Sequence, residues 1–451
     1  MFPCPALFSW ARVRTKEKGS FGSFPSVSFA VFDYFSFAQI LALFSSLLLQ
    51  QFNSVTTMNA KQWLAKLVSF DTTSRNSNLE LIHYCKDYLE GLGVKCTLVH
   101  NAEKTKANLW ATLPGEGGVT EGGIILSGHT DVVPVDGQKW NSDPFTLTER
   151  DGKLYGRGTS DMKGFVAVCM SMTPELLKMK RAKPIHFAWT YDEEVGCIGG
   201  QVLTDFLREH KIRAECCIVG EPTSNKLVVA HKGLFLYRVC VHGKAVHSSY
   251  AQTKQGCNAV YYAAKLIVKI NEIAENIKFY GMQDPCFDVP FTTMSPNLIQ
   301  GGNALNTVPA KCEFVYEMRY LPEAEAEKFE ERIKAYVNDT LLPSMKKAFG
   351  DARIELEKLS KTPPFKDANE KDPFTLLMRQ ITKDSTKRKV AYGTEAGQYQ
   401  AIGVPAVVCG PGSILQAHKP NEFVTLEQLD ECARIIRKAI QGDGAVARPH
   451  L

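Results

Sequence analysis

The chain has 451 residues, of which 44% are hydrophobic and 22% charged, and its formal net charge is +5. This length is too great for one compact domain, so we expect two or three. Basic and acidic residues are interspersed without a basic block, which argues against a nucleic-acid partner. The 13 cysteines are scattered and form no pair of C-x-x-C units. This pattern favours free thiols in a reducing compartment, and hence a cytoplasmic location, over a disulfide framework or a structural zinc cluster.

Residues 1–57 differ in composition from the rest of the chain, being rich in Phe and Ser and nearly free of acidic residues. Their apolar run at 37–52 is shorter than the roughly 18 residues of a membrane span and lies too far from the N-terminus for a signal peptide. Three explanations stay open: a start site placed too early, a targeting segment, or a membrane anchor. Met58 opens an amphipathic stretch, so we expect the fold, which itself needs no membrane, to begin there.

From residue 58 the chain alternates between strand and helix patterns, which is typical of an α/β domain with a mainly parallel sheet. Polar residues follow each predicted strand. Open α/β sheets bind ligands at the carboxyl ends of their strands, so these residues are expected to converge. Strands are predicted at 123–128, 183–191 and 215–220, and helices at 79–93, 164–172 and 199–211.

The pattern changes near residue 231, where alternating, half-exposed strands and two long helices replace it. We expect a small α+β unit inserted at 231–350. The α/β pattern then resumes at 351–440 and ends before a short tail at 441–451. The simplest interpretation is one α/β domain, formed by 58–230 and 351–440, that the inserted unit interrupts.

Five short stretches carry side chains that an α/β fold does not need for its own stability. They are SGHTDVV with His129 and Asp131, GRGTSDMKG with Asp161, DEEVG with Glu193 and Glu194, GEPT with Glu221, and QAHKPNE with His418. Each stretch alone has a structural explanation, such as a core histidine, a helix cap or a turn residue. Together they crowd carboxylates at one edge of the sheet, where the charges repel one another unless cations neutralise them. Nitrogen and oxygen donors of this kind suit zinc or a related divalent ion.

The residues leave part of the division of roles open. If His129 binds a metal through one ring nitrogen, the other nitrogen needs an acceptor, and Asp131 is the near candidate. Consecutive residues in an extended chain point to opposite sides. One of Glu193 and Glu194 is therefore expected to bind metal while the other acts as a general base, and either assignment is possible.

The five motifs resemble the signatures of the M20 family of two-metal hydrolases. The resemblance runs from about Met58 to Ile440, includes spacer text such as DPFTLTERDGKLYGRG, and leaves residues 1–57 without a counterpart. It implies a zinc-peptidase-like catalytic domain with a mainly parallel sheet. The inserted α+β unit is then a lid and dimerisation domain that forms a homodimer.

By position, the resemblance also implies two sites for divalent ions, zinc or cobalt. His129 and Glu221 complete one site, Glu194 and His418 complete the other, and Asp161 bridges the two.

The remaining roles follow from the same resemblance. Asp131 orients His129, and Glu193 is the general base. His247, in the lid, reaches the active site of a partner subunit and stabilises the oxyanion. The residues expected to contact the substrate are Lys232, Asn303, Arg319, Thr394 and Glu395.

The implied reaction is hydrolysis of a small N-acyl amino acid, with N2-acetyl-L-ornithine as the expected substrate in arginine biosynthesis. Other possibilities are N-succinyl-diaminopimelate, other N-acyl amino acids, and dipeptides. The glutamate at position 221 favours a deacylase over a dipeptidase. A non-enzymatic alternative is a catalytically silent, metal-dependent dimeric binding module, against which the intact Glu193 argues.

Overall fold

The computed structural model describes residues 57–443. The predictions for residues 1–57 and for the tail at 441–451 therefore lie largely outside the described residues. Within 57–443, no helix is both long enough and apolar enough to cross a membrane.

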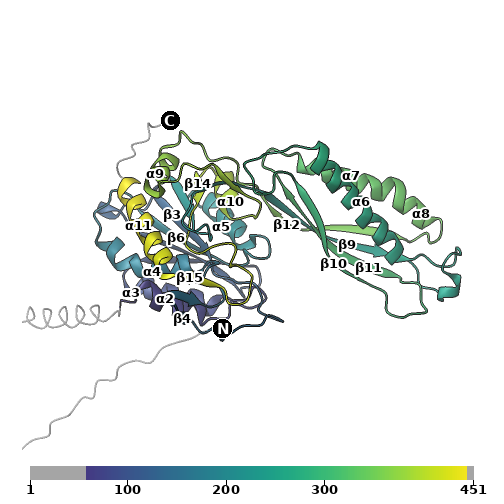
Figure 1. Cartoon of the computed structure of the whole chain (residues 1–451), viewed down its shortest axis with the longest axis horizontal. Helices are drawn as coiled ribbons and strands as arrows, with labels where there is room; N and C mark the ends of the chain where they lie inside the picture. The colour runs from purple at the N-terminus through teal and green to yellow at the C-terminus, as the bar shows by residue number, and fades with distance from the viewer. Residues whose placement is uncertain (1–56, 444–451) are drawn as a thin grey trace, which may run out of the picture. The chain divides into compact units, whose positions relative to one another are not determined.

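The first sheet has eight strands, and its middle is parallel (Figure 1). Strand β3 runs parallel to β6 and β7, and β7 runs parallel to β14. Every residue of β3, β6, β7 and β8 is buried, as expected of strands covered on both faces. In sheet order the strands are β1 (Lys95–His100), β2 (Ala107–Leu113), β6 (Ile185–Thr190), β3 (Ile124–His129), β7 (Cys216–Val219), β14 (Ala406–Val408), β8 (Val228–His231) and β13 (Arg388–Val390).

Helices cover the two faces of this sheet (Figure 1). On one face α4 packs against α2 and α11, and α11 packs against α9; on the other, α5 packs against α10. The expected α/β fold with a mainly parallel sheet is confirmed. The helices are α2 (Ala60–Val68), α3 (Leu79–Gly91), α4 (Lys163–Lys178), α5 (Ile198–Glu209), α9 (Pro373–Thr382), α10 (Ala396–Ala401) and α11 (Leu426–Asp443), with a short 3-10 turn η1 (Glu116–Gly118).

The three predicted strands correspond to β3, β6 and β7, and the three predicted helices to α3, α4 and α5. Most of their ends agree within two residues. Helix α4 is the exception, because it continues through Pro174 to Lys178.

A second, antiparallel sheet forms the unit inserted into this fold. Burial alternates along β9, so one face of the sheet is covered and the other is open. Helices α6 and α7 pack on the covered face, over a second hydrophobic core. In sheet order the strands are β10 (Thr293–Gly301), β11 (Lys311–Tyr320), β9 (Gly233–His242) and β12 (Arg353–Thr362), and the helical elements are η2 (Ser248–Tyr250), α6 (Ala259–Tyr280), α7 (Ala326–Tyr336), η3 (Val337–Leu341) and α8 (Leu342–Lys346).

The boundary expected at residue 350 is too early for this sheet, because β12 pairs with β9 as far as Thr362. The stretch RIELEKLSKT (353–362) belongs to the inserted sheet, not to the resumed α/β domain. It alternates apolar and charged residues, as a strand with one open face does.

A third, small sheet joins two segments that are far apart in the sequence. Strand β15 (Phe423–Thr425) pairs with β5 (Lys153–Tyr155), and β5 also pairs with β4 (Thr148–Arg150). The pairing of β15 with β5 brings the loop that carries Asp161 next to the segment that carries His418.

A buried glutamate fastens these two segments together. The carboxylate of Glu422 accepts hydrogen bonds from the main-chain N–H groups of Gly158 (3.1 Å), Ser160 (2.8 Å) and Asp161 (3.0 Å). It also pairs with Nη1 of Arg157 at 2.6 Å, and both side chains are buried. Burial raises the pKa of Glu422, and the charge of Arg157 opposes this rise. Glu422 thus holds the Asp161 loop in place from inside the protein.

We predict that Glu422→Gln lowers the free energy of unfolding of the metal-free protein by about 3–5 kcal/mol, because it leaves Arg157 buried without its anionic partner. Urea denaturation in the presence of a chelator measures this loss apart from any effect of metal. The control is Glu149→Gln, which breaks an exposed pair with Lys61 and should cost no more than about 1 kcal/mol. Equal effects of the two substitutions would contradict the role given to Glu422.

Candidate active site and metal centre

The candidate residues lie at the carboxyl ends of neighbouring parallel strands. His129 ends β3, Glu193 and Glu194 follow β6, and Glu221 follows β7. Asp161 precedes α4. Because β6, β3 and β7 are adjacent and parallel, their ends meet at the same edge of the sheet, as expected from the sequence.

The side chains form two groups, each able to hold a metal ion. The potential ligand atoms of His129, Asp161 and Glu221 all lie within 4.8 Å of one another, and so do those of Asp161, Glu194 and His418. Asp161 belongs to both groups. The arrangement is therefore that of two adjacent ion sites sharing one carboxylate.

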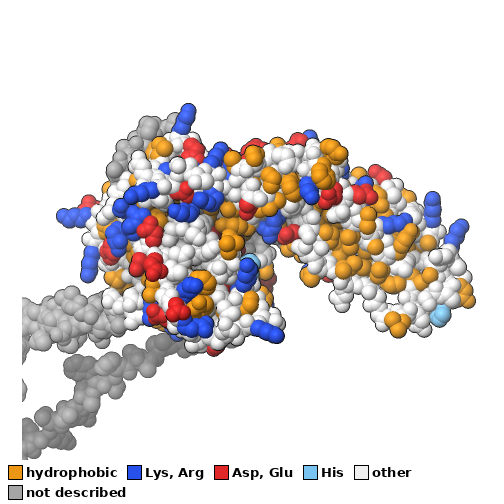
Figure 2. Space-filling view, in the orientation of Figure 1, with side chains coloured by type: hydrophobic (Ala, Val, Ile, Leu, Met, Phe, Trp, Pro, Cys, Tyr) orange, Lys and Arg blue, Asp and Glu red, His pale blue; other side chains and the backbone are white. Residues whose placement is uncertain are grey.

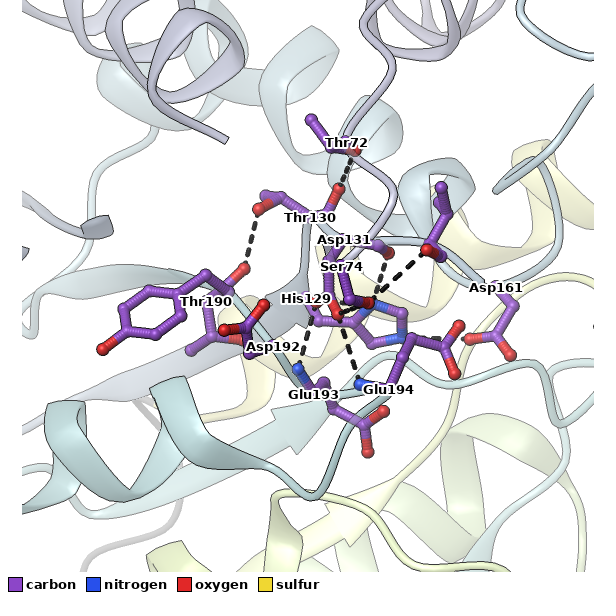
Figure 3. Close-up of polar contacts among 12 residues, drawn as sticks. Thr72, Ser74, His129, Thr130, Asp131, Asp161, Thr190, Asp192, Glu193 and Glu194 are labelled. Carbon is purple, nitrogen blue, oxygen red and sulfur yellow. Dashed lines mark hydrogen bonds and ion pairs between the residues drawn. The ribbon is translucent and has the colours of Figure 1, made fainter. Parts of the chain in front are cut away.

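The hydrogen bonds of His129 show which of its nitrogens faces this centre (Figure 3). Its Nδ1 lies 2.9 Å from the main-chain oxygen of Asp131. A carbonyl oxygen only accepts hydrogen bonds, so Nδ1 carries the proton. In the neutral ring, Nε2 then carries a lone pair, and this nitrogen lies 3.0 Å from Oδ1 of Asp161. Two acceptors at this distance need either a further proton or a cation between them.

The carboxylates of Glu194 and Glu221 also lack a compensating positive charge. Glu194 Oε1 and Glu221 Oε1 are buried without a hydrogen-bond partner among the described residues. Burial and the charge of Asp161 raise the pKa of Glu194 to about 7. Burial and the charge of Glu193 raise the pKa of Glu221 well above its usual value. Buried carboxylate oxygens that lack a hydrogen-bond partner and lie near other anions are suitable ligands for divalent cations. These residues therefore fit a metal site.

His418 and Asp161 complete the electrostatic balance of the second group. Nε2 of His418 lies 3.0 Å from Oε2 of Glu194 and 3.3 Å from Oδ2 of Asp161. These two contacts raise the pKa of His418 to about 10. Burial alone would raise the pKa of Asp161, but the hydrogen bonds with His129 and His418 hold it well below its usual range. Without a metal ion, protons on the two histidines thus supply the positive charge.

Asp131 positions the site differently from what we expected. Its carboxylate lies 3.6 Å from Nδ1 of His129, and the main-chain oxygen of Asp131 makes the closer contact. The carboxylate instead accepts hydrogen bonds from the main-chain N–H groups of Glu193 (3.1 Å) and Glu194 (3.3 Å) and from Oγ of Ser74 (2.7 Å) (Figure 3). One residue therefore orients both the histidine and the turn that carries the two glutamates.

That turn separates the two glutamates. Residues 192–196 form a turn rather than the extended chain expected from the sequence, and Asp192 has a φ of 52°. Glu194 belongs to the second donor group, whereas Glu193 belongs to neither. Oε1 of Glu193 accepts a hydrogen bond from the thiol of Cys197 at 3.2 Å. Desolvation raises the pKa of Glu193 to about 8.

A cavity of about 120 Å³ opens beside these residues, and both sheets contribute to its wall. Arg319 lines it from β11, and Nε and Nη2 of this arginine pair with the Glu317 carboxylate at 3.1 and 3.2 Å. Several apolar or small residues in the wall carry no motif that would mark them in the sequence. The lining residues are Asp161, Glu193, Glu194, Gly196, Cys197, Glu221, Leu234, Arg319, Thr362, Tyr392, Gly393, Ile414 and His418.

Of the five residues expected to contact substrate, only Arg319 lines this cavity. Lys232 is buried, and its Nζ donates to the main-chain oxygen of Phe291 at 2.5 Å. Thr394 and Glu395 are also buried. A sequence places such residues near a strand end but does not say which way tertiary packing turns them.

Two further expected site residues are exposed in the inserted unit. They are Asn303 and His247. Nδ1 of His247 accepts a hydrogen bond from the main-chain N–H of Ser249 at 3.3 Å and lies 2.9 Å from its Oγ. The N–H of the neutral ring is therefore on Nε2, where it is free to donate elsewhere.

Comparison with known proteins agrees with this geometry. Residues 125–442 match the model of peptidase family M20/M25/M40. The chain is 34% identical over 373 residues to the acetylornithine deacetylase of Pasteurella multocida, which covers 82% of this chain and 93% of the relative. It is 33% identical over 372 residues to the enzyme of the same name from Proteus mirabilis, covering 82% and 92%.

Solved structures share the fold at lower identity. An M20 family metallo-carboxypeptidase from Sulfolobus solfataricus superposes with a TM-score of 0.66 at 18% identity, covering 86% of this chain and 100% of that chain. Human carnosine dipeptidase 1 superposes with a TM-score of 0.63 at 18% identity, covering 90% and 100%. Given the match of the family model and the identity to these curated relatives, the chain belongs to peptidase family M20/M25/M40.

Proposed function

We propose that this metallohydrolase removes the acetyl group from N2-acetyl-L-ornithine, giving L-ornithine and acetate. The observation that carries the reaction class is the pair of donor groups that share Asp161, with Glu193 beside them and outside both. The choice of substrate is supported by the curated relatives, which bear the name acetylornithine deacetylase at 32–34% identity. In this proposal the enzyme serves arginine biosynthesis in the cytoplasm.

The ligands of the proposed ions follow from the two groups. His129, Asp161 and Glu221 would hold one divalent ion, and Asp161, Glu194 and His418 the other. Two such ions, zinc or cobalt, would supply Lewis-acid chemistry, which activates water as a nucleophile and polarises an amide carbonyl.

Proton transfer falls to Glu193. It lines the cavity without belonging to either donor group, so its carboxylate is free to take a proton from water and deliver it to the leaving amine. Burial raises the pKa of Glu193 above its usual value, which strengthens this carboxylate as a base. The Cys197 thiol and the Asp131 contact with the turn hold this carboxylate in place.

Recognition of the substrate is assigned to the inserted unit. Arg319 places a guanidinium group in the cavity wall, away from both donor groups, and we assign it to the substrate carboxylate. The outward N–H of His247 suits an oxyanion donor in a neighbouring subunit. Contact in trans requires a homodimer formed by the inserted units.

The surface of the inserted unit supports such a dimer. Figure 2 shows hydrophobic side chains gathered over α6. Val268, Phe279 and Tyr280 of α6 are 57%, 66% and 84% exposed, and Leu298 and Ile299 on the edge strand β10 are 69% and 58% exposed. Apolar groups concentrated beside an unpaired strand edge favour association with a second copy.

The first prediction concerns the substrate. The protein from Met58 to Leu451, stripped of metal and resupplied with zinc or cobalt, should release acetate from N2-acetyl-L-ornithine only in the resupplied state. Parallel assays with N-succinyl-diaminopimelate, other N-acyl amino acids and dipeptides test its specificity. Faster hydrolysis of one of these would keep the hydrolase class and overturn the assignment to ornithine.

The second prediction separates the two glutamates. Glu193→Ala should keep the full complement of metal, measured by elemental analysis, and lose about 10²–10⁴-fold in turnover because the proton carrier is gone. Glu194→Ala is the matched comparison, and it should lose metal as well as activity. If Glu193→Ala lost metal instead, Glu193 would be a ligand.

The third prediction tests His247 in trans. His247→Ala should lower kcat about 10²–10³-fold without loss of metal, whereas His100→Ala, at another exposed histidine, should not. Mixing inactive Glu193→Ala with inactive His247→Ala subunits should restore activity, because one site of the mixed dimer then has both groups. No restoration in a dimer shown to be mixed would place His247 outside the partner's site.

A further inference from the structure

A second type of metal-ligand cluster lies on the inserted unit, apart from the candidate active site. The potential ligand atoms of Cys240, His242 and Glu355 all lie within 4.8 Å of one another. Cys240 and His242 are partly buried and Glu355 is exposed. No residue of this cluster lines the cavity described above.

The register of the sheet places these residues together. Cys240 and His242 are two residues apart on β9, so they project from the same face. This face is the less buried one, opposite α6 and α7. Glu355 on β12 lies directly across from Cys240, and Glu313 on β11 lies across from it on the other side. The cluster therefore spans strands β9 and β12 on the open face of the sheet.

The polar contacts of the cluster turn its nitrogen, oxygen and sulfur atoms toward one another. Nε2 of His242 is shielded from solvent and makes no hydrogen bond among the described residues, although it lies 3.3 Å from Oε2 of Glu355. Arg353 takes the other oxygen, Oε1, at 2.7 Å. The Cys240 thiol donates to Oε2 of Glu313 at 3.3 Å. A histidine nitrogen and a carboxylate oxygen thus face each other beside a sulfur atom.

The charged side chains around the cluster compensate its negative charge only in part. Glu313 is compensated by Arg238 at 3.2 Å and Lys311 at 3.3 Å. Arg353 contacts Glu355 through one oxygen only. A thiolate at Cys240 and the Glu355 carboxylate would together carry two negative charges, and Arg353 offsets part of the charge of Glu355 from its other oxygen. The remaining negative charge would favour a divalent ion.

We propose that Cys240, His242 and Glu355 bind a divalent metal ion, and zinc is the best suited. The bound ion would connect β12 to β9. Sulfur, imidazole nitrogen and carboxylate oxygen are together the ligand types of zinc, whereas magnesium and calcium prefer oxygen alone. The proposal does not depend on the reaction assigned to the catalytic domain. The donor set differs from that of the active site, which contains nitrogen and oxygen only.

This difference in donors provides a selective test. The full-length protein is freed of metal, loaded with cobalt(II), and its near-ultraviolet absorption is recorded. A thiolate bound to cobalt gives a charge-transfer band there, and the active-site donors contain no sulfur. The band should appear in the native protein, vanish in Cys240→Ser, and persist in Cys286→Ser, which alters an exposed cysteine. Elemental analysis should find one metal ion fewer per chain in Cys240→Ser.

Two further variants keep the test decisive if Cys240→Ser folds poorly. His242→Gln and Glu355→Gln should each lose the same ion and keep the metal of the active site, counted by elemental analysis. The proposal is overturned if cobalt gives no thiolate band and the metal content is the same in all variants, which would leave the cluster as a network of ion pairs. Because active-site metal is counted in the same samples, failure of this site is distinguishable from failure of the catalytic one.

Discussion

The structure depends on several carboxylates that are buried together at the carboxyl edge of the central sheet. Asp161, Glu194 and Glu221 lie together there, and two of the three have an oxygen atom without a hydrogen-bond partner among the described residues. Like charges this close destabilise the fold unless cations compensate them. His129 and His418 can do so only as protonated rings or as ligands of a metal ion. The same deficit of positive charge therefore accounts for the raised pKa values and for the proposed pair of ions.

The carboxylates stay in this arrangement because two other carboxylates hold the loops that carry them. Asp131 accepts hydrogen bonds from the turn with Glu193 and Glu194, and Glu422 accepts them from the loop with Asp161. Each comes from a segment distant in the sequence from the loop that it holds. Main-chain hydrogen bonds thus set the positions of the candidate ligands, which is the preorganisation that metal sites and catalysis require.

The strand ends and the main cluster were predictable, because long apolar runs mark buried strands and the polar residues after them must meet at one edge. The contacts within the cluster were not. Whether His129 meets the carboxylate or the main-chain oxygen of Asp131 depends on the turn at 192–196, and the DEEVG motif does not reveal the backbone conformation of that turn. Thr394 and Glu395, expected to contact substrate, are buried and do not line the cavity. The reason is related, because tertiary packing rather than sequence position decides which way a buried side chain points.

Strand β12 links the inserted unit to the catalytic turn. The hydroxyl groups of Ser360 and Thr362 donate hydrogen bonds to the main-chain oxygen of Gly196 at 2.9 and 3.0 Å. The N–H of Gly196 in turn donates to the main-chain oxygen of Glu193 at 2.9 Å. A displacement of β12 would therefore shift the residue assigned to proton transfer. Glu355 belongs to the same strand, so an ion that ties β12 to β9 on the open face would also restrain the catalytic turn.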